Sequence, residues 1–141
     1  SWITILKKRN NFRAAFQGFD PNLIATWGEE DVQRLLQDAG IIRHRGKIEA
    51  TIRGAQAYLR IEAREGFAPF VWKHVDHRPI VNRLPDMGAA QAQTPASQAL
   101  AKSLKSEGFA FCGPTIAYAF MQATGMVNDH LVSCPQHPDN Q

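Results

Sequence analysis

Cysteine is scarce in this chain, and a long apolar run is missing altogether. Only Cys112 and Cys134 occur among 141 residues, too few for a disulfide-stapled fold, which favours a reducing, cytoplasmic location. No stretch reaches the roughly 18 apolar residues that a membrane-spanning helix needs, so we expect no membrane partner. The alternation of apolar and polar residues that is typical of strands is also missing. These absences predict an all-α fold.

The charge balance says little by itself. The net charge is +3 and the sequence pI is about 9.1, which is compatible with a nucleic-acid partner but does not establish one. The length suits one helical domain over residues 1–141, with a small core. We expect this domain to act as a monomer.

Apolar spacing and helix-start signals predict the order of the helices. From Trp2 to Phe19, apolar residues recur at spacings of three or four, which predicts a helix. No capping residue precedes this helix, so we expect an N-terminal part before Ser1 to be missing. Further helices are expected after Asp20, after Gly28, and over about 43–63, 67–75, 95–107 and 114–124. Residues 76–93 are expected to form a loop.

The connection between the last two helices is the most informative segment. Gly108 suits the left-handed backbone at a helix end, and Pro114 suits a first helical position, where its missing N–H costs nothing. The second helix then begins with unpaired N–H groups that attract an anion. This pattern, over about 95–124, predicts a helix–hairpin–helix that holds a DNA phosphate; an ordinary helical hairpin is the alternative. The expected phosphate contacts are Gly108, Phe111, Cys112, Gly113 and Thr115.

Three blocks carry a resemblance to a known family. The segment Gly108–His130, followed by Leu-Val-Ser-Cys134, resembles the DNA-3-methyladenine glycosylase I family, and the blocks 1–9 and 38–48 agree. The resemblance runs through essentially the whole chain in family order and spacing. It implies the all-α helix–hairpin–helix DNA glycosylase fold and hydrolysis of the N-glycosidic bond of 3-methyladenine in alkylated double-stranded DNA, as in base-excision repair.

The catalytic residue is unknown from this sequence. Endonuclease III-type relatives carry an aspartate where this chain has Asn128, and an amide cannot act as a general base. The hairpin also lacks a lysine that could form a Schiff base, so we expect a monofunctional glycosylase without lyase activity. Asp129 is a substitute candidate, although a capping or supporting role is favoured.

The resemblance places a base-recognising glutamate upstream of Ser1. Whether these 141 residues are active alone therefore stays open, and a non-catalytic helix–hairpin–helix DNA-binding module is the alternative function.

Trp2 is the candidate base-binding residue. An extruded base needs an aromatic surface to replace lost stacking, and a cationic base gains further from an indole ring. The resemblance implies this role for Trp2, whereas without it a buried core tryptophan is the better interpretation. Trp27 and Trp72 match no binding motif and are expected in the core.

His130 and Cys134 are the candidate metal ligands. Their spacing of four residues can direct both side chains at one metal ion. The resemblance implies a structural zinc whose other ligands, a cysteine and a histidine, lie upstream of Ser1. His137 is a lower-ranked substitute ligand, and an unligated Cys134 thiol or a disulfide with Cys112 is the alternative.

Two basic clusters complete the list of candidates. Phosphate contact is conceivable for either, but a solvated face is the commoner explanation of such clusters. The clusters are Lys7, Lys8, Arg9 and Arg13, and Arg43, His44, Arg45 and Lys47.

Overall fold

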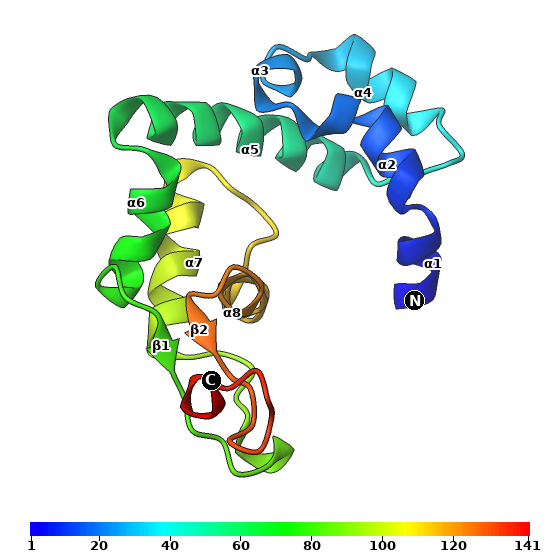
Figure 1. Cartoon of the computed structure of the whole chain (residues 1–141). Helices are drawn as coiled ribbons and strands as arrows, with labels where there is room; N and C mark the ends of the chain where they lie inside the picture. The colour runs from blue at the N-terminus through cyan, green and yellow to red at the C-terminus, as the bar shows by residue number, and fades with distance from the viewer. The chain divides into compact units, whose positions relative to one another are not determined.

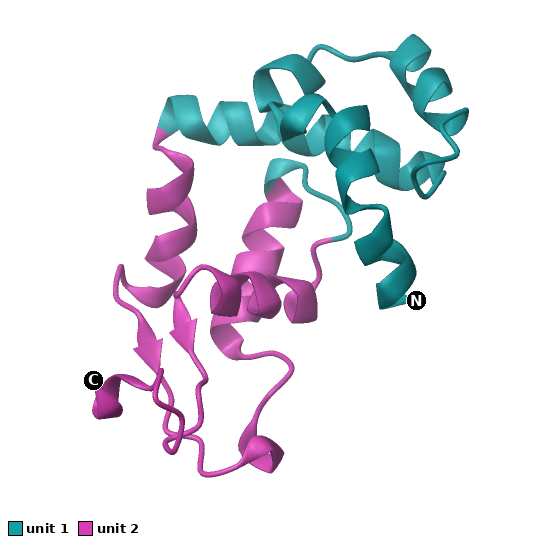
Figure 2. Cartoon of the chain, turned by 45° about the vertical axis from the view of Figure 1, so that its right-hand side comes forward, with its two compact units in different colours: residues 1–64, 107–111 teal, residues 65–106, 112–141 magenta.

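Helices dominate the structure, a computed structural model that describes residues 1–141 (Figure 1). The chain divides into two compact units, shown in Figure 2. Unit 1 comprises residues 1–64 and 107–111, and unit 2 comprises residues 65–106 and 112–141. The predicted all-α class is confirmed, with one small parallel strand pair as the exception. No helix is both long enough and apolar enough to cross a lipid bilayer.

Unit 1 is built from five α-helices and a short 3-10 turn. They are α1 (Trp2–Lys7), α2 (Arg9–Ala15), η1 (Gln17–Phe19), α3 (Pro21–Ile24), α4 (Glu29–Leu36) and α5 (Arg45–Arg64). The predicted start at Asp20 is confirmed, because its carboxylate accepts a hydrogen bond from the Asn22 N–H at 2.9 Å. α4 is capped by Asp31, whose carboxylate accepts from the Gly28 N–H at 3.1 Å. Short polar side chains at helix starts thus set these boundaries.

The N-terminal apolar spacing does not produce one continuous buried face. The chain breaks between α1 and α2 at Lys8, and α1 has no buried residue. Trp2 is 82% exposed, whereas Phe16 is 3% exposed. The apolar side chains of this segment reach the core only from Phe12 onward.

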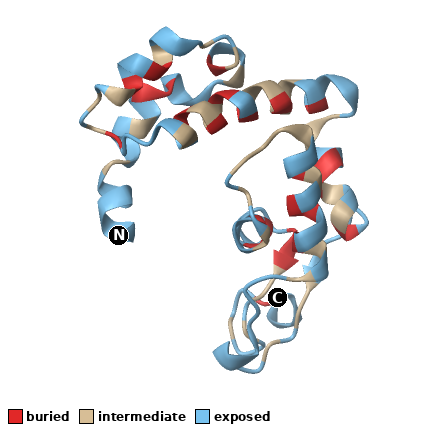
Figure 3. Ribbon diagram, turned by 180° about the vertical axis from the view of Figure 1, so that it is seen from behind, coloured by how far each residue is buried: buried red, intermediate tan, exposed pale blue.

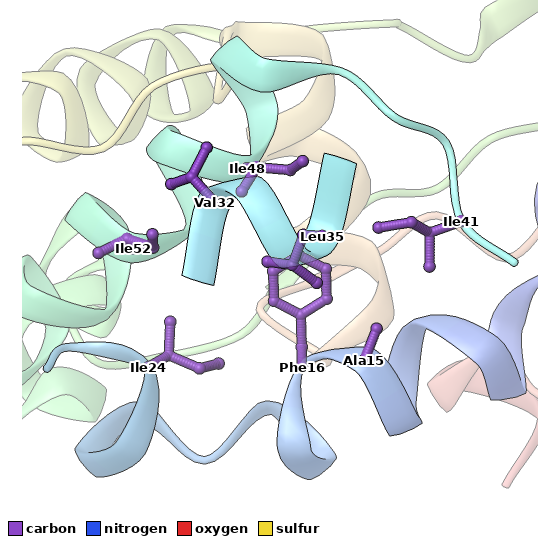
Figure 4. Packing of buried hydrophobic residues seen from close by; sticks show 8 residues of the cluster. All are labelled: Ala15, Phe16, Ile24, Val32, Leu35, Ile41, Ile48 and Ile52. Atoms are coloured by element: carbon purple, nitrogen blue, oxygen red, sulfur yellow. The ribbon is translucent and has the colours of Figure 1, made fainter. Parts of the chain in front are cut away.

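The core of unit 1 forms where α5 meets the preceding helices (Figure 4). Buried residues recur along α5 at helical spacing, as Figure 3 shows. Ile48 and Ile52 are the α5 members of the cluster, and Phe12 and Trp27 pack at its edge. The buried cluster is Ala15, Phe16, Ile24, Val32, Leu35, Ile41, Ile48 and Ile52. This apolar burial stabilises unit 1.

Unit 2 holds the remaining elements. They are α6 (Phe67–Trp72), η2 (Lys73–Val75), β1 (Ile80–Val81), η3 (Met87–Ala89), α7 (Pro95–Glu107, whose last residue belongs to unit 1), α8 (Pro114–Ala123), β2 (Val127–Asn128) and η4 (Pro138–Asn140). α7 begins with a reciprocal cap: the Ser97 N–H donates to Thr94 Oγ1 at 3.2 Å, and the Thr94 N–H donates to Ser97 Oγ at 2.8 Å.

The expected loop at residues 76–93 contains a strand that the sequence did not reveal. β1 and β2 pair in parallel, with the Ile80 N–H donating to the Met126 carbonyl at 2.8 Å. Strands of two residues are too short to leave an alternating pattern in the sequence. The pairing fixes the segment after α8, where the candidate metal ligands lie.

Candidate nucleic-acid interface

Gly108 is required by the fold. It follows α7 with a φ of +113°, a conformation that L side chains rarely adopt. A Cβ at this position would also lie 3.2 Å from the Arg60 guanidinium, which donates to the carbonyl of Glu107 at 2.9 Å. Arg60 thereby satisfies a carbonyl at the end of α7.

Gly113, in contrast, is not required by the fold. Its φ of −71° and ψ of 174° are open to any residue, and a Cβ built there would meet nothing within 4 Å. It is the N-cap of α8, where no side chain caps the helix and Pro114 follows. The unpaired N–H groups expected at this helix start are therefore uncapped, and open space lies beside Gly113 for an anion to approach the backbone.

Phe111 is an exposed aromatic residue in a left-handed conformation. Its φ is +60°, and its side chain is 53% exposed. Within unit 1, the His44 ring meets the Phe111 ring edge-on, with centroids 5.9 Å apart and planes at 83°. The Lys47 ammonium lies 5.6 Å from the Phe111 ring centroid. The second basic cluster therefore lies against the hairpin, a proximity that the sequence does not reveal.

The members of that basic cluster have different roles. Arg45 pairs with Glu29 and, at 2.7 Å, with Glu49. The hydrogen bond from Arg45 lowers the pKa of Glu29. Lys47 is exposed and has no carboxylate within ion-pair distance. Arg45 thus serves the fold, while Lys47 keeps its charge available to a partner.

A largely apolar cleft of about 530 Å³ lies within unit 1. Its lining residues are Ser1, Thr4, Ile5, Phe12, Phe16, Phe19, Ile42, Lys47, Ile48 and Thr51. Trp2 is not among them. Its side chain is exposed among the residues described here. Trp27 and Trp72 are partly buried, and Trp27 packs against Phe16 with centroids 5.9 Å apart.

Asn128 and Asp129 are both engaged in structural hydrogen bonds. Asn128 Oδ1 accepts from the His130 N–H at 3.0 Å, which shapes the turn after β2. The Asp129 carboxylate accepts from Asn82 Nδ2 at 2.6 Å, from Gln122 Nε2 at 2.9 Å and from the Tyr118 hydroxyl. Asp129 and its three side-chain donors come from three separate segments of unit 2.

The hydrogen bonds determine the ionisation of Asp129. Burial alone would raise the pKa of this carboxyl, but the bonds from Tyr118, Asn82 and Gln122 outweigh burial and lower the pKa. Burial, together with the hydrogen bond to Asp129, raises the pKa of Tyr118. A carboxylate with three donors and a lowered pKa is a poor general base. Sequence reasoning missed this cluster; the spacing of Tyr118 and Gln122 on one face of α8 was its only signal.

The candidate metal ligands lie close together. His130 Nδ1 and Cys134 Sγ are 3.7 Å apart, so both side chains can reach one ion. His137 is fully buried; its Nε2 bonds to the Asn82 carbonyl at 2.9 Å and its Nδ1 accepts from the Asp139 N–H at 3.1 Å. The chain contains no group of three or more metal-ligating side chains. His130 and Cys134 therefore fit part of a zinc site. Both ring nitrogens of His137 already form hydrogen bonds, which disfavours His137 as a substitute ligand.

Neither cysteine forms a disulfide. Burial raises the pKa of the Cys112 thiol, which favours its neutral form at physiological pH.

The short connection between α7 and α8 and the uncapped start of α8 are the features that a helix–hairpin–helix protein requires. The family described as methyladenine glycosylase matches residues 1–137. DNA-3-methyladenine glycosylase 1 of Escherichia coli (strain K12) is 55% identical over 142 residues, which cover 100% of this chain and 76% of that protein. The DNA-3-methyladenine glycosylase of Haemophilus influenzae is 49% identical over 136 residues, which cover 96% and 74%. The chain therefore belongs to the methyladenine glycosylase family.

A solved structure agrees with this assignment. The crystal structure of a 3-methyladenine DNA glycosylase I is 56% identical, has a TM-score of 0.90 and covers 98% of this chain and 76% of that one. The predicted glycosylase fold is thus confirmed. Family membership also supports the enzyme over the non-catalytic binding module considered from the sequence.

Proposed function

We propose that this protein hydrolyses the N-glycosidic bond of 3-methyladenine in alkylated double-stranded DNA. Family membership supports the reaction. The structural observation that carries the DNA-binding part is Gly113, a glycine that the fold itself does not need, at the uncapped start of α8. A glycine that neither its backbone conformation nor its neighbours require is explained by a ligand that must approach the backbone closely.

The reaction needs little acid–base help from this chain. Methylation at N3 gives the base a positive charge, so it leaves with the bonding electron pair as a neutral molecule. Water adds to C1′ of the deoxyribose and loses a proton, which leaves an abasic site. The hydrogen bonds of Asn128 and Asp129 support a reaction in which neither residue abstracts that proton. The bound base is held in place while the weakened bond breaks.

We propose that the hairpin binds the DNA backbone. The contacts are Gly108, Phe111, Cys112, Gly113 and Thr115, through backbone groups and the uncapped start of α8. Phosphate binding of this kind carries no sequence information. It suits an enzyme that must search DNA for rare damaged bases.

We further propose that Trp2 stacks on the extruded methylated base. Its indole is 82% exposed and is therefore available to a ligand. An electron-rich ring attracts a cationic base more strongly than a neutral one. Trp2 thus contributes to selection of the damaged base.

A structural zinc is the proposed cofactor. His130 and Cys134 supply two ligands, and a four-ligand site requires two more from residues outside this sequence. A closed set of protein ligands leaves no position for a reacting water, so the metal stabilises the fold near the C-terminus.

The cysteines form no disulfide, which agrees with a reducing cytoplasm, where we propose that the enzyme works as a monomer.

The test is release of base from methylated DNA by the intact protein. Duplex DNA treated with a methylating agent should yield 3-methyladenine, detected by chromatography, with single exponential kinetics under enzyme excess. The DNA strand should remain intact until alkali is added, because the enzyme lacks lyase activity. Unmethylated duplex is the control. Binding to methylated duplex without base release would reject the glycosylase in favour of a binding module.

A further inference from the structure

A cluster of three side chains in unit 1 connects the start of α5 to the hairpin. The three residues are His44, Lys47 and Phe111, called here the 44–47–111 cluster: the His44 ring and the Lys47 ammonium both contact the Phe111 ring. His44 also caps α5, because its Nδ1 accepts the Lys47 N–H at 3.1 Å. Gly46 permits this packing: a Cβ there would lie 3.0 Å from His44 Cε1 and 3.8 Å from Phe111 Cζ. The first turn of α5 is thus fitted to the hairpin residue.

Lys47 occupies a distinct place in this cluster. Its ammonium lies over the Phe111 ring at 5.6 Å, and the same side chain lines the apolar cleft of unit 1. Arg45, two residues earlier, is held by Glu29 and Glu49, whereas Lys47 has no carboxylate partner and is exposed. The chain therefore presents one uncompensated charge between the hairpin residue and the cleft.

Phe111 contacts the Lys47 ammonium from a backbone conformation that is unfavourable for a residue other than glycine. A non-glycine residue at φ +60° is uncommon and is maintained by its surroundings. Here the His44 ring and the Lys47 ammonium both contact its ring. Contact with the ring restricts the Lys47 side chain before a ligand binds, so less conformational entropy is lost when the ammonium binds one.

We propose that Lys47 binds a phosphate of the damaged DNA strand beside the cleft, as an ionic contact additional to the hairpin amides. The ligand chemistry follows from the side chain: an exposed ammonium that lies against an aromatic ring but has no carboxylate partner attracts a phosphodiester oxygen. The inference rests on the proposed DNA-binding function and assigns to it a residue that the hairpin motif does not contain. Phe111 is the positioning residue for Lys47.

Salt dependence of DNA binding measures this contact directly. Each phosphate neutralised by a lysine contributes about 0.9 to the slope of log K against log salt concentration. Lys47→Gln should therefore lower the magnitude of the slope by about 0.9 and weaken binding about eightfold at ~0.1 M salt, for all duplex sequences alike. Lys47→Arg should retain the slope. The protein is the intact chain, and the probe is a fluorescent duplex carrying a stable abasic-site analogue.

Lys102→Gln is the matched control, because it removes the same charge from another exposed lysine. If both variants change the slope equally, the effect is general electrostatic attraction and the proposal is wrong. An unchanged slope for Lys47→Gln also rejects it. Phe111→Leu should give a partial loss of affinity, with most of the slope retained. A collapse of binding in Phe111→Leu with no effect of Lys47→Gln would instead indicate base stacking on Phe111 and would overturn the lysine contact.

The wild-type protein separates this inference from the function on which it rests. If the wild type neither binds the probe nor releases 3-methyladenine, the proposed function fails. If the wild type does both and Lys47→Gln behaves like the wild type at every salt concentration, only the lysine contact fails. Thermal unfolding of the variants checks the fold, which should change little on substitution of an exposed lysine that forms no ion pair.

Discussion

The phenolic hydroxyl of Tyr118 donates a hydrogen bond to the carboxylate of Asp129, eleven residues further along the chain. Asn82 and Gln122 donate to the same carboxylate. The carboxylate thereby joins α8, the segment after β1 and the turn after β2. Charge-assisted bonds of this kind are stronger than neutral ones. The relationship assigns Asp129 to the fold rather than to the chemistry.

Asp129→Asn should therefore destabilise the protein without abolishing excision. The amide keeps one acceptor oxygen but loses the charge, and since the site is partly exposed we expect a loss of about 1–2 kcal/mol in the free energy of unfolding. Urea unfolding measures this loss, and Tyr118→Phe, which removes one donor only, should cost less. Single-turnover excision at a temperature where the variant is folded should stay within about threefold of the wild type. A loss of more than about a hundredfold would make Asp129 catalytic.

Gly108 and Gly113 should respond oppositely to alanine substitution. Gly108→Ala places a Cβ at φ +113° and should destabilise the fold by about 1–3 kcal/mol. Gly113→Ala should leave unfolding unchanged, because its Cβ meets no neighbour, but should weaken DNA binding on the order of tenfold by blocking one charge-assisted contact. Thermal unfolding and fluorescence anisotropy measure the two effects. If Gly113→Ala binds DNA with normal affinity, the proposed phosphate contact at the start of α8 is wrong.

Trp2→Ala should reduce base excision while leaving binding to undamaged duplex unchanged. Stacking on an aromatic side chain contributes about 1–3 kcal/mol per base, so single-turnover excision should fall roughly tenfold or more. Trp2→Phe should restore part of the rate. Because the side chain is 82% exposed, the stability of the variant should match the wild type. Loss of excision together with loss of stability would indicate a folding role.

Alkylation of Cys112 should require a higher pH than alkylation of an ordinary thiol. Burial raises its pKa, and the thiolate is the reactive form. The rate of reaction with iodoacetamide, followed at Cys112 by peptide mass spectrometry, should reach half its maximum at a higher pH in the folded protein than in the unfolded one. Unfolding in guanidinium is the internal control and should return the midpoint to the ordinary value. A midpoint below that value in the folded protein would contradict a desolvated thiol.

Zinc content should depend on His130 and Cys134. The intact protein should hold about one zinc per chain, and His130→Ala or Cys134→Ala should lose most of it. The 141 residues alone should hold little or none, because missing ligands forfeit part of the ~10–16 kcal/mol that complete structural sites supply. His77→Ala, at an exposed histidine, is the control. Stoichiometric zinc in the 141-residue chain would mean that other residues of this sequence complete the site.

The sequence by itself determined the helical class, most helix boundaries and the hairpin. Local signals account for this success, because Asp20 caps α3 through its own side chain and Pro114 begins α8 as proline does at a first helical position. The family could also be recognised from blocks of sequence. Such features depend on residues close together in the chain.

Tertiary structure decided which side chains meet. The contact between Lys47 and Phe111 joins residues 64 positions apart, and that between Asn82 and Asp129 joins residues 47 positions apart. No local periodicity encodes pairs at such separations, because they depend on how helices pack. The same holds for Gly108 and Gly113: both suit a helix boundary, but only their surroundings show that the fold requires the first and leaves space beside the second.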